Sequence, residues 1–175
     1  MKAMTLTLAA FLAATSAFAQ SAAEKSGINS LVGAAPKTED FVKEVSMSDM
    51  YEIEASKVAL EHPDNATKAF AQQMVQDHQK TTSELKQLLV SGKVKAAPAT
   101  AMSEDQNESL GELKGLQGAA FSKQYRDDQI EAHEDAIDIF GRYAENGDNS
   151  ELKSWAAKTL PALQHHLEMA RALSK

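Results

Sequence analysis

The stretch FAQQMVQDHQKTTSELKQLL, residues 70–89, decides the fold. Its apolar and small side chains recur every three or four positions, which places them on one face of an α-helix. That face carries, in order, Phe70, Met74, His78, Thr81, Leu85 and Leu88. The motif HPDN at residues 62–65 ends the preceding helix and caps the helix that contains residues 70–89. Ser91-Gly92 ends that helix. The sequence therefore predicts a long amphipathic helix between these two signals.

Three other segments repeat this spacing and predict three more long helices. One begins at Thr38 and ends at residues 62–65, one runs from about Gly118 to residues 146–147, and one begins at residue 149 or 150. Only a few residues separate the first helix from the second and the third from the fourth. Links this short are typical of antiparallel helical hairpins.

A longer connection of about twenty-five residues, 92–117, separates the second helix from the third. Within it, residues 93–101 contain Pro98 and are expected to be extended, whereas residues 103–116 are expected to form a short helix. We therefore predict an all-α domain over residues 38–173, a ferritin-like four-helix bundle with a long crossover between helices 2 and 3. An up-and-down bundle with an irregular loop is the alternative.

Composition agrees with a helical protein and excludes several classes of function. Aromatic residues make up only 6% of the chain against 43% hydrophobic residues, a bias away from β-structure. The absence of cysteine excludes a disulfide scaffold and a thiolate zinc site. Eighteen basic against 25 acidic residues give a net charge of −7, which argues against nucleic acid as a partner.

The N-terminus has the pattern of a secretory signal peptide. Lys2 precedes an apolar stretch at residues 3–14, and an Ala-x-Ala site follows that predicts cleavage after Ala19. A membrane helix is the alternative, but the stretch is shorter than the ~20 apolar residues that a span needs, and no later segment is long and apolar enough. We expect a signal peptide at residues 1–19, a leader without regular structure at residues 20–37, and an exported, periplasmic protein.

One polar residue interrupts the apolar face of each predicted helix. These residues are Glu52, His78, His133 and His166, and each lies about 14 to 16 residues after the expected start of its helix. At ~1.5 Å per residue, all four fall within about one turn of the middle of the bundle, whichever way each helix points. Their side chains are therefore expected to converge.

Convergence has two explanations. Three imidazoles and one carboxylate form a ligand set for zinc, copper, iron or manganese, and not for calcium or magnesium, which prefer oxygen ligands. Alternatively, the histidines belong to a buried hydrogen-bond network in which Glu52 is their partner and Gln129, Tyr125 and Thr159 take part.

Several neighbours of these positions have less specific roles. Asp77 is expected to face solvent or a helix seam, and His62 is expected to be solvated in its turn. Met74 and Met169 lie one turn from the histidines, where thioethers either pack in the core or bind copper(I). Pro161 predicts either a kink in the fourth helix or a break into two helices.

The segments that carry these positions resemble the bacterial domain of unknown function 4142 (DUF4142) family over about residues 39–173. The resemblance rests on residues 70–78 with Glu84-Leu85, residues 51–54, residues 118–121 with Tyr125, and residues 160–167. It implies a ferritin-like helical bundle in exported bacterial proteins, often labelled outer-membrane or membrane proteins, and no established activity. The family pattern falls on Glu52, residues 77–78, His133, Pro161 and His166.

No motif for phosphate binding, metalloprotease activity or a nucleophilic serine is present, so the sequence leans away from an enzyme. A di-iron site needs a Glu-x-x-His motif on two helices, but Val75, Ile130 and Leu163 stand three residues before the histidines. Our leading hypothesis is one transition-metal ion, bound for metal handling or envelope stress. The alternatives are a metal-free interaction or stress protein and, third, a redox enzyme with an open coordination position.

Overall fold

The computed structural model describes residues 30 and 32–173, and the regular secondary structure of this part of the chain is entirely helical. It contains five α-helices and no strand, which confirms the all-α prediction. The helices are α3 (Thr38–Leu60), α4 (Asn65–Val90), α5 (Glu104–Gly115), α6 (Gly118–Asn146) and α7 (Ser150–Ala172). The predicted signal peptide at residues 1–19 and most of the predicted leader lie outside the described residues. No described helix has the length and apolarity that crossing a membrane requires.

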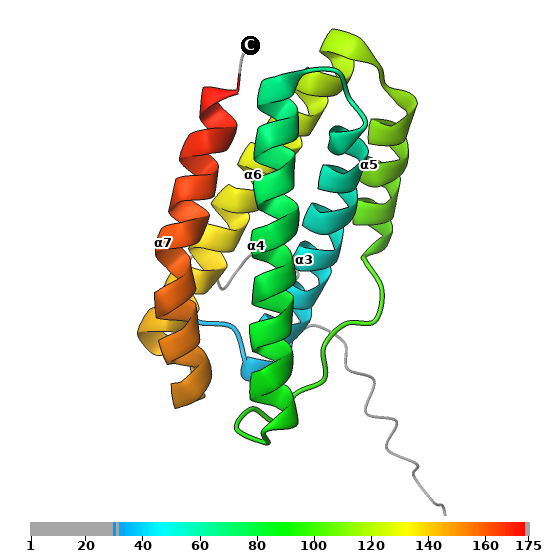
Figure 1. Cartoon of the computed structure of the whole chain (residues 1–175). Helices are drawn as coiled ribbons and strands as arrows, with labels where there is room; N and C mark the ends of the chain where they lie inside the picture. Colours follow the sequence, from blue (N-terminus) through cyan, green and yellow to red (C-terminus); the bar gives the residue numbers. More distant parts are fainter. Residues whose placement is uncertain (1–29, 31, 174–175) are drawn as a thin grey trace, which may run out of the picture.

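Two helical hairpins form the body of the structure (Figure 1). The α3–α4 link ends at Asp64, whose carboxylate accepts a hydrogen bond from the Thr67 backbone N–H at 2.8 Å. The α6–α7 link ends at Asn149, whose side chain accepts one from the Leu152 N–H at 3.0 Å. Both residues satisfy a backbone donor that the first turn of a helix leaves without a partner. The hairpins also pack against each other, α3 on α6 and α4 on α7.

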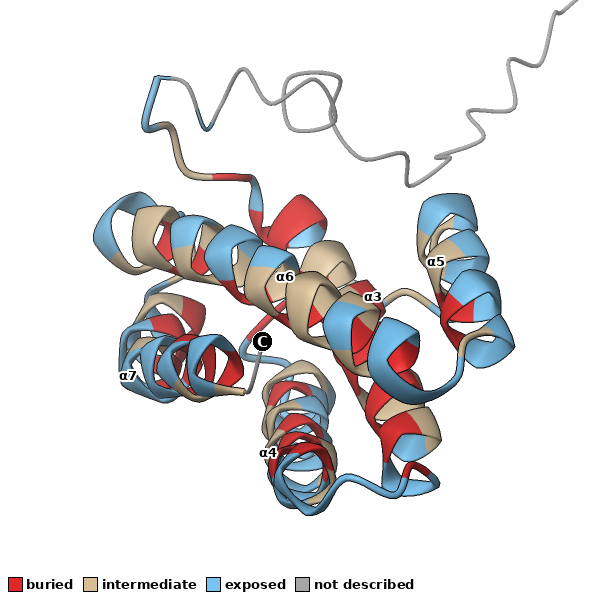
Figure 2. Ribbon diagram, turned by 90° about the horizontal axis from the view of Figure 1, so that it is seen from above, coloured by how far each residue is buried: buried red, intermediate tan, exposed pale blue. Residues whose placement is uncertain are grey.

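The short helix α5 lies beside α3, outside the group of four long helices (Figure 2). It begins with a capping box, in which Ser103 and Gln106 each accept a hydrogen bond from the other residue's backbone N–H. Leu110 and Leu113 are its buried side chains. The chain then turns into α6 at Gly118, whose φ of 55° favours glycine because other side chains clash in that conformation.

The core consists of two apolar clusters at opposite ends of the long helices. The first gathers Phe41, Phe140 and Trp155 from the start of α3, the end of α6 and the start of α7. The second gathers Phe70 and Tyr125, among others, from the opposite helix ends. Along α4, α6 and α7, one buried histidine on each helix lies between the residues of the two clusters: His78, His133 and His166. A polar layer therefore separates the two halves of the core.

Helix α7 remains a single helix through Pro161, so the alternative of two helices is wrong. Proline removes the hydrogen bond that the carbonyl of Ala157 would accept. Both residues are exposed, so water can satisfy that carbonyl.

The expectation that His62 is solvated is also wrong. Its side chain is buried, and its ring stacks on Phe121 with 3.5 Å between centroids and 11° between ring planes. Because the α3–α4 link folds over the start of α6, a residue in a turn here becomes part of the core.

Candidate metal centre

Three histidines from three different helices meet between the two apolar clusters. His78 on α4, His133 on α6 and His166 on α7 have ring centroids 5.3 to 5.7 Å apart. One ring nitrogen from each lies within 4.8 Å of the others, and all three side chains are buried. The histidines that interrupt the apolar faces of these three helices are therefore neighbours in the core, as the sequence predicts.

Each histidine uses one ring nitrogen to donate a hydrogen bond. His78 Nδ1 donates to Asp49 Oδ1 at 2.9 Å, His133 Nδ1 to the Gln129 carbonyl at 2.7 Å, and His166 Nε2 to Asp77 Oδ2 at 2.8 Å. A carbonyl or carboxylate oxygen only accepts, so the bonded nitrogen must carry the proton. The second nitrogen of a neutral ring then holds a lone pair.

Those second nitrogens have no hydrogen-bond partner among the described residues. They are His78 Nε2, His133 Nε2 and His166 Nδ1, and all three are buried. Buried polar atoms almost always have a partner, so three such atoms on neighbouring rings from three helices need an explanation. Imidazoles that donate through one nitrogen to a carboxylate or carbonyl and offer the other are typical of metal ligands.

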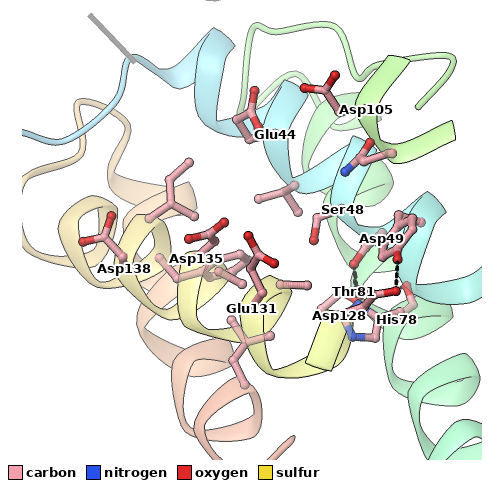
Figure 3. A pocket seen from close by; sticks show the side chains of 18 of the residues that line it. Glu44, Ser48, Asp49, His78, Thr81, Asp105, Asp128, Glu131, Asp135 and Asp138 are labelled. Atoms are coloured by element: carbon pink, nitrogen blue, oxygen red, sulfur yellow. Dashed lines mark hydrogen bonds and ion pairs between the residues drawn. The ribbon is translucent and has the colours of Figure 1, made fainter. Parts of the chain in front are cut away.

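Asp49 on α3 orients His78 and was missed in the sequence. It is buried near Thr81 (Figure 3) and also accepts a hydrogen bond from the hydroxyl of Thr81 at 3.2 Å. The hydroxyl of Thr82 donates to its other oxygen at 2.8 Å. Its position three residues before Glu52 was the available signal, since side chains three apart share a helix face.

Asp77 lies at the seam between α4 and α7, one of the two places expected for it. Its bond to His166 joins these helices across the centre. Met74 and Met169, the methionines one turn from the histidines, pack with the second apolar cluster.

Glu52 is buried in α3, and among the described residues no donor lies within hydrogen-bond geometry of either carboxylate oxygen, although the Gln129 amide is near. Burial raises its pKa to about 7, although the charge of His78 and the amide of Gln129 act in the opposite direction. Glu52 is outside the group of histidines whose nitrogens lie within 4.8 Å of one another. The structure therefore brings three of the four predicted residues together and places the fourth close enough to influence His78.

The electrostatics leave two of the histidines neutral near pH 7. Burial lowers the pKa of His133 to about 3 and also lowers the pKa of His166. Burial acts in the same direction on His78, but its bond to Asp49 and the charge of Glu52 outweigh it and raise its pKa. The exchangeable protons of the centre are therefore held by His78 and Glu52.

A family model, Domain of unknown function (DUF4142), matches residues 13–173 of the chain. The chain belongs to the DUF4142 family. Comparison with curated proteins and with solved structures gives no match. Since the family's description names no activity, the chemistry of this DUF4142 protein has to be argued from its own residues.

The donor set of this DUF4142 protein is rich in nitrogen. Three imidazoles with one nearby carboxylate suit zinc, copper, iron or manganese, provided that the His78/Glu52 pair gives up its proton to the metal, whereas calcium and magnesium require mainly oxygen ligands. Because three histidines leave a tetrahedral ion one further position, that position is available to Glu52, to water or to a small ligand.

Proposed function

We propose that this protein binds one transition-metal ion through His78, His133 and His166, with Glu52 as the fourth ligand. One observation carries the proposal: within the part of the chain that the structure describes, three buried imidazole nitrogens and a buried carboxylate near them find no hydrogen-bond partner. A cation would satisfy the three nitrogens, and its charge would offset the cost of burying the nearby carboxylate. Zinc, copper, iron and manganese are the candidate ions.

In a metal-free polar network, the competing explanation, the second nitrogen of each histidine would need a partner, and the described residues supply none. Tyr125 pairs with Ser56, at 2.8 Å between hydroxyls, and Thr159 donates to the Trp155 carbonyl at 3.0 Å. Neither bonds to a histidine. A network that fixed the helix register would have these groups satisfied by one another.

The wider setting that we propose is a ferritin-like four-helix bundle, with α5 in its crossover, that is exported to the periplasm after cleavage behind Ala19. The contacts of the two hairpins and the N-terminal sequence pattern support this setting. Such a protein would serve metal handling or the response to envelope stress.

Elemental analysis tests the proposal. We expect near-stoichiometric metal in untagged protein purified without chelators, and none in a His78→Ala/His166→Ala variant. His165→Ala is the control, because His165 neighbours the site but is exposed. No bound metal, together with a melting temperature unchanged by zinc, copper, iron or manganese, would leave the metal-free network as the explanation.

Removing the Asp77 carboxylate, which orients His166, should weaken metal binding without abolishing it. We expect Asp77→Asn to weaken zinc binding about 10- to 100-fold, because the amide is a poorer acceptor for the His166 N–H and no longer fixes its tautomer. Asp127→Asn, an exposed aspartate paired with Lys123, is the matched control. Equal zinc dissociation constants for the two variants, measured by competition with a chelating dye, would argue against this role of Asp77.

A further inference from the structure

A cleft of about 870 Å³ lies between α3, α5 and α6, and its walls are strongly acidic (Figure 3). Seven of its lining residues carry carboxylates: Glu44, Asp49, Asp105, Asp128, Glu131, Asp135 and Asp138. Among the described residues that line it, Arg142 alone carries a permanent positive charge, and it forms an ion pair with Asp138 at 2.9 Å. The cleft therefore has a large excess of negative charge.

Helix α6 supplies four of these carboxylates as a ladder along one face. Asp128, Glu131, Asp135 and Asp138 follow at spacings of three, four and three residues, so they lie above one another. Ten residues of helix give the ladder a length of about 15 Å. Like charges at these spacings destabilise a helix.

The inner end of the cleft reaches one member of the histidine cluster, His78. His78 lines the cleft although its side chain is only 5% exposed, and its Nε2 is one of the unpartnered nitrogens. Asp128 lies at the same end, close to His78, whereas Asp138 lies at the far end of the row (Figure 3). The carboxylate ladder thus leads from the outer part of the cleft to a buried ring nitrogen that can bind an ion.

We propose that this cleft is the path by which a hydrated divalent transition-metal cation reaches the centre. The inference rests on the proposed metal binding and adds the route and the role of the acids. Negative charge in a cleft with low-dielectric walls concentrates cations and raises association rates by about 10- to 1,000-fold. Carboxylates hold such ions more weakly than a set of imidazoles does, so an ion passes from the ladder to the histidines with a gain in affinity.

Stopped-flow measurement of Co²⁺ binding tests this path, with the ligand-field absorption of Co²⁺ as the signal and the purified full chain as the sample. We expect Glu131→Gln/Asp135→Asn to lower the association rate constant about five- to tenfold at low salt and to reduce its dependence on salt. The amount of Co²⁺ bound at saturation should not change.

The control is Glu112→Gln/Glu168→Gln, which removes the same charge from exposed positions that do not line the cleft. We expect it to bind Co²⁺ within twofold of the wild-type rate. Equal rates for the two double variants would overturn the proposed path while stoichiometric binding still supported the metal centre. An absence of the Co²⁺ signal in the wild type would overturn both proposals.

Discussion

Saturating zinc should raise the melting temperature of this protein by about 8–16 °C at pH 7.5. A ligand that binds only the folded state stabilises it by about 4 kcal/mol when its free concentration is 1,000 times its dissociation constant. In a domain of this size, 1 kcal/mol corresponds to about 2–4 °C. Differential scanning calorimetry with and without zinc, followed by addition of a chelator, measures the shift and its reversal.

The zinc-induced shift should shrink as the pH falls. His78 has a raised pKa and Glu52 has a pKa of about 7, so this pair holds at least one proton below neutral pH. Zinc must displace that proton, whereas His133, with a pKa of about 3, keeps its lone pair free. One displaced proton weakens binding about tenfold per pH unit, or about 2.7 kcal/mol between pH 7.5 and pH 5.5.

Two comparisons make the zinc prediction specific. The His165→Ala variant should show the full shift, and the His78→Ala/His166→Ala variant should show none. The same shift at pH 5.5 as at pH 7.5 would mean that neither His78 nor Glu52 gives up a proton to the metal.

The helices and the three histidines could be predicted because both follow from a period of 3.6 residues. His133 and His166 fall on the same helix faces as buried Phe121, Phe140 and Leu163, and the short links fix which helices are neighbours. A polar residue on such a face must lie in the core. Distance from the helix start then gives its level along the axis.

Asp49 and His62 could not be predicted in this way because their burial depends on several neighbours at once. Helix α3 contacts α4, α5 and α6, so its buried arc is wider than one face and includes Asp49 as well as Glu52. His62 is buried because the α3–α4 link folds over Phe121. Neither contact leaves a periodic signal in the sequence.

The acidic cleft also depends on tertiary placement. The spacing of the α6 carboxylates is visible in the sequence, but an exposed acidic face is common on soluble helices. Only the position of α5 beside α3 turns that face into a wall opposite Glu44 and Asp105 (Figure 3). Because the acidic row ends near His78, the structure supports a role for these carboxylates in metal binding that the sequence alone does not indicate.

Replacing Glu52 by glutamine should stabilise the metal-free protein and weaken the metal-bound one. The pKa of the buried carboxyl is raised from 4.5 to about 7. The folded state therefore retains the proton more strongly than the unfolded state, and a penalty develops as the pH rises from 4.5 through 7. Above pH 7 this penalty is on the order of 3 kcal/mol, and glutamine removes it because the amide does not ionise.

Glu52→Gln is thus expected to stabilise the metal-free protein and to destabilise the metal-bound protein. This opposite effect on stability distinguishes a metal ligand from a structural residue. At pH 8, denaturant unfolding of the metal-free variant should show a gain of about 2–3 kcal/mol that vanishes near pH 4.5, while zinc binding falls about 100-fold. The control Glu54→Gln, on the exposed side of α3, should change neither quantity by more than about 0.5 kcal/mol. A metal-free variant that is less stable than wild type at pH 8 would contradict the expected release of a burial penalty and would favour a structural role for the Glu52 carboxylate.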